Sequence, residues 1–262
     1  MTTLTPSNDI SQHGLTFFRI DKGRNHHYVD QAGNKIPGVT SILGDGMPKP
    51  ALLPWGIKSV SEYAVNNWEE LSKLPISDRL TTLKGSPYAE RDAAANRGTE
   101  VHRFAEMLIK GEAVSPPLEI RPYVENYARF LDEWEVEPYL VEVSIVNHRV
   151  RYCGTLDMVV RIPKLGDGLF IADIKTNRSG VYGETAFQLA AYANAERYQQ
   201  DGLEYDFPKG IERGFVIHVT AEACKLYELP ITPKVFRQFC YVAEVAKAAN
   251  ESKGYVREVT NG

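Results

Sequence analysis

Two runs of apolar, β-branched residues lie close together near the middle of the chain. The first, Gly-Thr-Leu-Asp-Met-Val-Val-Arg-Ile, begins at Gly154, and the second, Leu-Phe-Ile-Ala-Asp-Ile-Lys-Thr, passes through Lys175. Between them, the stretch from Pro163 to Gly168 contains Pro, Lys, Gly and Asp, which are residue types that favour turns. Because β-branched residues favour strands, this pattern predicts two antiparallel strands joined by a short turn.

Apolar residues elsewhere recur at helical or strand spacing and predict the remaining elements. The expected helices cover about 50–74, 88–109, 121–134, 184–199 and 232–253, the expected strands cover about 139–146, 213–220 and 225–231, and short strands begin near Leu15. In the first helix Trp55, Tyr63 and Trp68 share one face, which favours a role in the core over a role in stacking on bases. The order of elements predicts an α/β fold in which helices cover a mixed central sheet.

Each of the two central strands carries a carboxylate at a position where a core residue is expected. On the second strand, alternation places Asp173 and Lys175 on the same face. The short turn brings Asp157, on the first strand, alongside Asp173. Burying two carboxylates side by side costs several kcal/mol unless a cation compensates, so the pair favours a divalent metal. Taken alone, each aspartate is more often a solvated residue at a strand edge.

Composition and charge restrict the classes of function. The 262 residues carry a formal net charge of -4 with a pI of about 5.9, which argues against a generally basic surface for nucleic acid. Three cysteines, Cys153, Cys224 and Cys240, are too far apart in sequence for a disulfide framework or a zinc motif. The chain has no apolar run of eighteen residues and no signal-like start. We therefore expect a soluble cytoplasmic protein that is not associated with a membrane.

The motifs in combination resemble a known family. Gly-x-x-Asp ending at Asp157, Asp-Ile-Lys-Thr beginning at Asp173, and a following helix with Gln188 and Tyr192 four residues apart are together similar to the PD-(D/E)XK nucleases, most closely their RecB-type exonuclease branch. The resemblance implies a restriction-endonuclease-like core at residues 97–262. Residues 1–96 are then expected to form an N-terminal extension of a β-hairpin and helices, similar to that of phage-encoded exonucleases.

The resemblance also implies a set of site residues. Asp157, Asp173 and Lys175 correspond to the catalytic residues, and Gln188 and Tyr192 correspond to the motif that holds the substrate strand and the lysine. The expected metal ligands are His102, Asp157, Asp173 and the backbone carbonyl of Ile174, binding one or two Mg2+ or Mn2+ ions. Some relatives hold an iron-sulfur cluster through four cysteines, and because this chain has three we predict no cluster.

The sequence alone does not assign a role to two glutamates. Glu106 lies four residues after His102, so it shares a helix face with the histidine. It forms a surface pair with His102, orients it, or takes part in binding. Glu142 lies within an expected strand and is either a solvated residue or a fifth member of the site. Without the family motif, Gln188 and Tyr192 could equally be an ordinary contact between a helix and the sheet.

The function that this resemblance implies is metal-dependent hydrolysis of DNA. We expect an exonuclease that acts on single strands or DNA ends in viral or bacterial recombination, replication or repair, in the host cytoplasm if the source is viral. The expected partners are DNA and a recombination or replication protein. The alternatives are an endonuclease or junction resolvase with the same site, or a DNA-binding module of the same fold that does not cleave.

Overall fold

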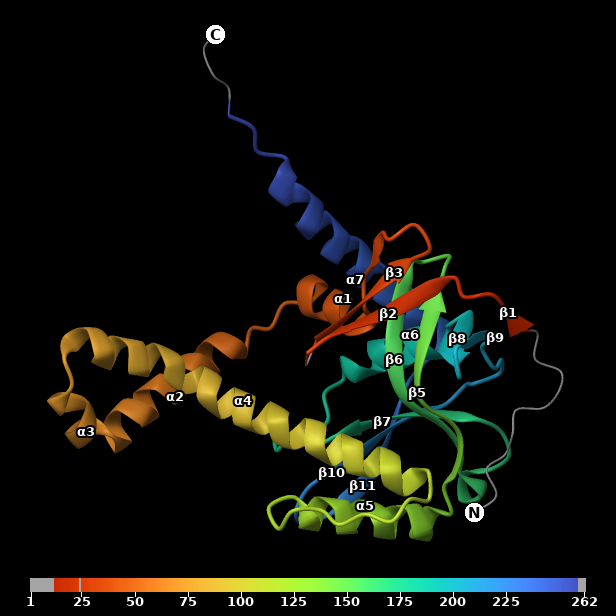
Figure 1. The fold of residues 1–262 in the computed structure, drawn as a ribbon, viewed down its shortest axis with the longest axis horizontal. Helices are drawn as coiled ribbons and strands as arrows, with labels where there is room; N and C mark the ends of the chain where they lie inside the picture. Colours follow the sequence, from red (N-terminus) through yellow and green to blue (C-terminus); the bar gives the residue numbers. More distant parts are fainter. Residues whose placement is uncertain (1–11, 24, 259–262) are drawn as a thin grey trace. The chain divides into compact units, whose positions relative to one another are not determined.

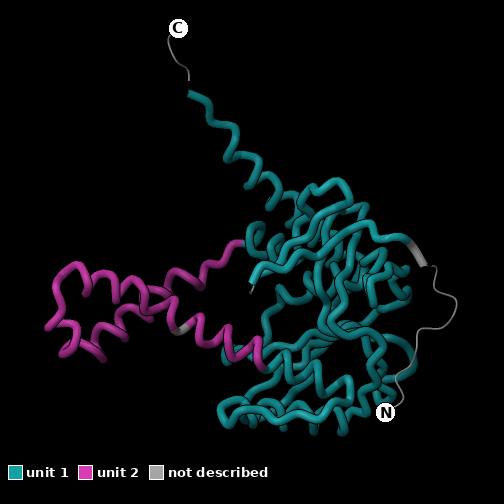
Figure 2. Tube along the Cα trace, viewed as in Figure 1, with its two compact units in different colours: residues 1–47, 101–262 teal, residues 48–100 magenta. Residues whose placement is uncertain are grey.

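The computed structural model of the chain describes residues 12–23 and 25–258. Contacts divide the chain into two compact units, which are coloured separately in Figure 2: residues 1–47 together with 101–262, and residues 48–100. Among the described residues, no helix combines the length and the apolar character that crossing a bilayer requires.

The first unit is built on a mixed β-sheet, which contains eight strands among the described residues. In spatial order they are β1 (Gln12–His13), β9 (Leu203–Asp206), β8 (Arg197–Gln200), β5 (Glu137–Asn147), β6 (Tyr152–Arg161), β7 (Phe170–Lys175), β10 (Gly214–Val219) and β11 (Cys224–Leu229). β7 and β10 run parallel, and the other neighbours run antiparallel. Figure 1 shows β5, β6 and β7 side by side, as the sequence predicts for the two central strands and the one before them.

Helices cover both faces of this sheet and form two apolar clusters with it. One cluster joins the sheet to α1 (Val39–Gly46), α6 (Thr185–Ala193) and α7 (Pro233–Glu251), through residues such as Ile42, Leu189 and Phe239. The other joins it to α5 (Arg121–Trp134) and the last turns of α4 (Ile76–Ile109), through residues such as Phe104 and Tyr127. Short 3₁₀ helices occupy Pro163–Leu165 and Ser252–Gly254. The predicted α/β architecture, a mixed sheet flanked by helices, is therefore confirmed.

A small β element precedes α1 and belongs to the same unit. Its strands are β2 (Phe17–Lys22), β3 (Asn25–Asp30) and β4 (Lys35–Ile36). The buried side chains of Phe17 and Tyr28 form an apolar cluster with Cys153 at the start of β6. This packing explains why residues 1–47 group with the core, whereas the sequence placed them in an extension that ends at residue 96.

The second unit consists of α2 (Leu52–Asn66), α3 (Trp68–Lys73) and the first part of α4. The expected single helix over 50–74 is divided at Asn67, whose backbone N–H bonds to the carbonyl of Tyr63. The expected core face is wrong: none of the α2 residues, all of which the structure describes, is buried. Trp55 is 39% exposed and Trp68 is 56% exposed. Helical spacing identifies an apolar stripe, but it does not reveal whether another element covers that stripe.

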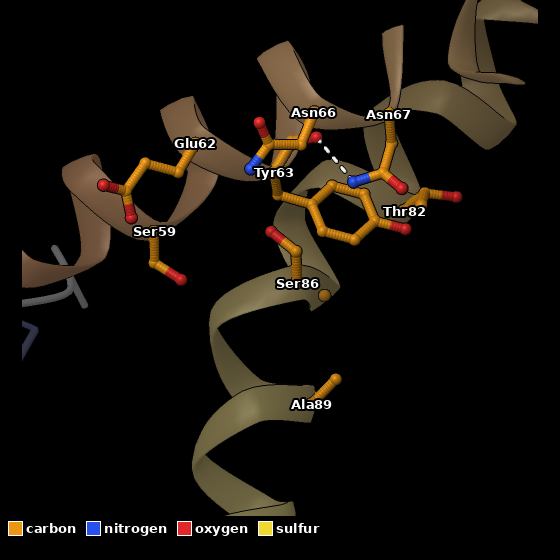
Figure 3. A pocket seen from close by; sticks show the side chains of 9 residues that line it. Ser59, Glu62, Tyr63, Asn66, Asn67, Thr82, Ser86 and Ala89 are labelled. Atoms are coloured by element: carbon orange, nitrogen blue, oxygen red, sulfur yellow. Dashed lines mark hydrogen bonds between the residues drawn. The ribbon is translucent and has the colours of Figure 1, made fainter. Parts of the chain in front are cut away.

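Within this unit a polar pocket lies between α2 and α4 (Figure 3). Its wall contains Tyr63 from α2 and Asn67, the residue that follows α2. Ser86 and Ala89 from α4 line the other side. The side-chain amide of Asn67 donates to the carbonyl of Tyr63 at 2.9 Å, which fixes that end of the pocket.

Two further boundaries differ from the sequence prediction. Residues 88–109 belong to a single longer helix, α4, which begins at Ile76 instead of near residue 88. The helix expected to reach residue 199 ends at Ala193, where the Asn194 N–H bonds back to the carbonyl of Ala190. Residues Arg197–Gln200 then form β8, whose Tyr198 is fully buried and pairs with β5 and β9. Long-range pairing therefore overrides the local helical tendency.

Candidate metal and active site

Three acidic residues lie at the same level on three neighbouring strands. The register between β5 and β6 places Glu142 opposite Asp157. Pairing between β6 and β7 stops at Met158 and Ala172, one residue before Asp157 would meet Asp173. The two strands therefore separate at the point where both carry an aspartate. The sequence prediction that the turn brings these two aspartates together agrees with this register.

Glu142 has an irregular backbone within a strand that continues on both sides of it. Its φ of 53° lies in the left-handed region, which non-glycine residues seldom adopt inside a strand. Local irregularities of this kind re-aim side chains and occur often beside active sites. Here the irregularity accompanies a Glu142 carboxylate that approaches Asp157 and His102. The backbone conformation cannot be read from the sequence, which explains why the role of Glu142 stayed open there.

His102, Glu142 and Asp157 form a candidate metal site. Each offers one ligand atom, and these three atoms all lie within 4.8 Å of one another in partly buried positions. His102 Nδ1 lies 3.5 Å from Asp157 Oδ2, which also accepts a hydrogen bond of 2.7 Å from the backbone N–H of Ile174. An imidazole with two carboxylates suits Mn2+ and other divalent ions that accept both nitrogen and oxygen ligands. The helix α4 thus supplies the histidine on the side of the sheet where β6 and β7 separate.

A second group of polar residues surrounds Asp173. Lys175 Nζ lies 2.5 Å from Asp173 Oδ2. Gln188, on α6, donates to Asp173 Oδ1 at 2.8 Å, and its carbonyl oxygen accepts from Lys175 Nζ at 3.3 Å. The same amide reaches the hydroxyl of Tyr192 at 3.4 Å. The structure therefore brings together four of the five residues that the sequence motif combined, with Gln188 bonded to both members of the ion pair.

The charges of this group depend on burial and on neighbouring carboxylates. Burial, with the charge of Asp157, raises the pKa of Asp173 although Lys175 acts in the opposite direction. Burial of the ammonium lowers the pKa of Lys175, but the charges of Asp173 and Asp157 outweigh it, so that pKa lies above its ordinary value. Lys175 consequently remains a cation at neutral pH. A general base must be in its neutral form. Lys175 therefore suits a different role, in which its positive charge stabilises a negative group.

Glu142 is the most strongly perturbed carboxyl on this side of the sheet. Burial, followed by the charges of Asp157 and Glu106, raises its pKa to about 8. Two neighbouring carboxylates that disfavour the ionisation of Glu142 form an environment that a bound cation would relieve. Raised pKa values of this origin are common at functional sites.

The donor set of His102, Glu142 and Asp157 decides whether a metal fits, and one imidazole nitrogen with two carboxylates suits a divalent cation. Asp173 is almost fully buried, and its Oδ2 lies 2.5 Å from Lys175 Nζ, so an ion pair already compensates the charge of this oxygen. Asp173 itself lies outside the compact ligand group, which differs from the expected set. The Ile174 carbonyl stays a prediction, because the bond shown for Ile174 at this site is that of its N–H.

Glu106 takes a surface position. It pairs with Lys110, one helical turn later, at 2.5 Å. Among the described residues, no hydrogen bond joins Glu106 to His102, so neither a surface pair with His102 nor the orienting role has a contact behind it, and a part in binding stays a prediction. Its charge still contributes to the raised pKa of Glu142.

Gly154 is required by the packing between β6 and α6. A Cβ atom at this position would lie 2.6 Å from Cε1 of Tyr192 and 3.4 Å from Val39. Because the Tyr192 ring is buried in the core, it cannot move aside freely. We expect Gly154→Ala to lower the free energy of unfolding by about 1–3 kcal/mol in chemical denaturation. Gly183→Ala, where a Cβ meets no atom within 4 Å, is the matched control. Equal stability of the two variants would contradict this interpretation.

Comparison with known proteins adds little. No family model matches this sequence, and no curated protein matches it. Among solved structures the chain is similar to a crystal structure of a protein named SSO0001, at 17% identity and a TM-score of 0.31. That similarity covers 52% of this chain and 60% of the other, so it spans less than two thirds of that protein. At this TM-score it supports no argument about fold family or function.

Proposed function

We propose that this chain is a metal-dependent deoxyribonuclease of the PD-(D/E)XK type, close to the RecB-type exonuclease branch. One observation carries the proposal. The ligand atoms of a histidine and two carboxylates lie within 4.8 Å of one another, beside an Asp173–Lys175 ion pair on the next strand. Acidic ligands with an adjacent lysine are the groups that hydrolysis of a phosphodiester requires. The sequence motifs support the same assignment independently.

The residues that would hold Mg2+ or Mn2+ are His102, Glu142 and Asp157, with Asp173 as the further ligand that the family resemblance implies. Such an ion, when bound, polarises a phosphate oxygen and lowers the pKa of a coordinated water. Asp157 is fixed for this purpose by the Ile174 N–H. His102 is held on α4, whose last turns pack against the sheet through a buried cluster.

Lys175 stabilises negative charge in this proposal. Its ammonium remains protonated and is positioned by Asp173 and Gln188, so it can face the extra charge that develops on a phosphate during attack. Gln188 keeps the ion pair oriented, and Tyr192 supports Gln188 from the core. These two residues therefore act through Lys175 and Asp173. Preference for free DNA ends rests on the family resemblance.

The decisive experiment uses the purified full chain with linear single-stranded DNA labelled at one end and with covalently closed single-stranded circles. With Mg2+ or Mn2+ we expect degradation of the linear substrate, no degradation in EDTA, and survival of the circles. Cutting of the circles under the same conditions would favour the endonuclease alternative. Intact linear DNA with both ions would favour the non-catalytic module and would reject the proposed activity.

A further inference from the structure

The β2–β3 hairpin reaches the strand that carries Asp157. Arg19 and Tyr28 are paired across this hairpin. Tyr28 OH lies 2.8 Å from Thr155 Oγ1, and Arg19 Nη1 donates to the same oxygen at 3.0 Å. Thr155 precedes Asp157 by two residues on β6, so alternation places them on one face about 7 Å apart. The hairpin therefore contacts the sheet one side-chain step from the candidate metal site.

The Arg19 guanidinium is hydrogen-bonded through two of its three nitrogens among the described residues. Its Nε donates to Asp21 at 3.0 Å, and Nη1 bonds to Thr155, but Nη2 has no hydrogen bond to any residue that the structure describes. The side chain is 35% exposed. Its positive charge also acts on Glu142, where it opposes the rise in pKa that burial causes. A guanidinium that is fixed in place, partly open to solvent and next to an acidic site is thus available for a ligand.

The hairpin does not need Arg19 in order to stay attached to the sheet. Phe17 and Tyr28 are buried against Cys153, and the Tyr28 hydroxyl already bonds to Thr155. The Asp21 carboxylate is 65% exposed, and exposed ion pairs contribute little to stability. The hairpin therefore has an apolar and a polar anchor that are both independent of Arg19.

We propose that Arg19 binds a backbone phosphate of the DNA strand next to the phosphate that is cleaved, which makes the β2–β3 hairpin part of the substrate-binding surface. This inference rests on the proposed nuclease function. A guanidinium presents a planar set of N–H donors that matches phosphate oxygens. The molecule carries a net charge of -4, so DNA binding at the site depends on local cations, and Arg19 would add one in addition to Lys175.

The test measures binding without cleavage. A labelled single-stranded oligonucleotide is titrated with the full chain carrying Lys175→Ala, in Mg2+ and at several salt concentrations. Adding Arg19→Gln should weaken binding roughly threefold to tenfold and reduce the slope of log affinity against log salt by about 1. Arg149→Gln is the matched control, because Arg149 is 87% exposed in the turn between β5 and β6 and pairs only loosely with Glu196, at 3.7 Å. It should leave both quantities unchanged.

Asp21→Asn separates phosphate binding from a structural role. It removes the carboxylate that competes for Arg19, so affinity for the oligonucleotide should stay the same or rise. If Asp21→Asn weakens binding as much as Arg19→Gln does, the Arg19–Asp21 pair is structural and the inference is overturned. It is also overturned if Arg19→Gln leaves affinity and salt slope unchanged while the unmodified chain cleaves DNA, a result that leaves the proposed function standing. A chain that neither binds nor cleaves DNA would reject both.

Discussion

Replacing Asp157 by alanine should abolish both DNA cleavage and divalent-metal binding, whereas replacing Lys175 by alanine should abolish cleavage alone. Asp157 belongs to the ligand group, its Oδ2 lies 3.5 Å from His102 Nδ1, and β6 carries no other carboxylate that could take its place. An ammonium cannot bind a metal ion, so loss of Lys175 removes charge stabilisation and leaves the ligands intact. Removing one such stabilising group typically costs about 10²–10³ in rate.

The two readouts are independent. Cleavage is followed on end-labelled linear DNA, and metal binding is followed by calorimetric titration of Mn2+ into the metal-free protein. Asp167→Ala and Lys164→Ala, in the turn between β6 and β7, are controls of the same residue types that lie outside the site. Near-normal cleavage by either Asp157→Ala or Lys175→Ala would reject the proposed site. Loss of Mn2+ binding in Lys175→Ala would indicate that the ion pair, and not the ligand group alone, shapes the metal site.

Asp173→Ala distinguishes the two possible ligand sets. We expect it to abolish cleavage, because Lys175 loses the partner 2.5 Å away that holds it. It should also weaken Mn2+ binding if the buried Oδ2 serves the ion as well as Lys175. Unchanged Mn2+ affinity would instead restrict the ligands to His102, Glu142 and Asp157.

The parts of the fold that depend on local pattern could be predicted from the sequence. β-branched runs on either side of a turn predict β6 and β7, and the residues after Pro117 predict α5 with the bounds observed, Arg121–Trp134. The neighbouring positions of Asp157 and Asp173 follow from the same pattern, because the hairpin register places them directly beyond the last paired residues, Met158 and Ala172. Gln188, four residues before Tyr192, likewise falls on the helix face that meets the sheet.

The remaining features depend on contacts between distant segments. β8 resembles the end of a helix in sequence and becomes a strand because β5 and β9 pair with it. The apolar stripe of α2 has the spacing of a core face but is not covered. Glu142 enters the site through a left-handed backbone that no residue pattern marks, and Arg19 does so because its hairpin packs on β6. In none of these cases does local residue spacing carry the deciding information.

Glu142→Gln is expected to stabilise the metal-free protein at alkaline pH while it weakens metal binding. The folded-state pKa of about 8 lies above the ordinary value of 4.5, mainly because of burial. Between those two pH values the native state binds more protons than the unfolded state at this residue. The free energy of unfolding therefore falls as pH rises through that window. A glutamine does not ionise, so the variant should lose this part of the pH dependence.

Asp173 also has a raised pKa, so it also makes the free energy of unfolding fall as pH rises. Subtracting the free energy of unfolding of wild type from that of Glu142→Gln at each pH leaves the contribution of Glu142. In urea unfolding with EDTA, the two proteins should be similar near pH 5, and the variant should be more stable near pH 8 by on the order of a few kcal/mol. With Mn2+ the order should reverse: an amide lacks the ligand charge, so Mn2+ affinity should fall at least roughly tenfold. Glu137→Gln, at the exposed start of the same strand, should change neither quantity. If Glu142→Gln is no more stable than wild type at pH 8 and binds Mn2+ equally well, Glu142 is not part of the metal site, and His102 and Asp157 must be completed by Asp173.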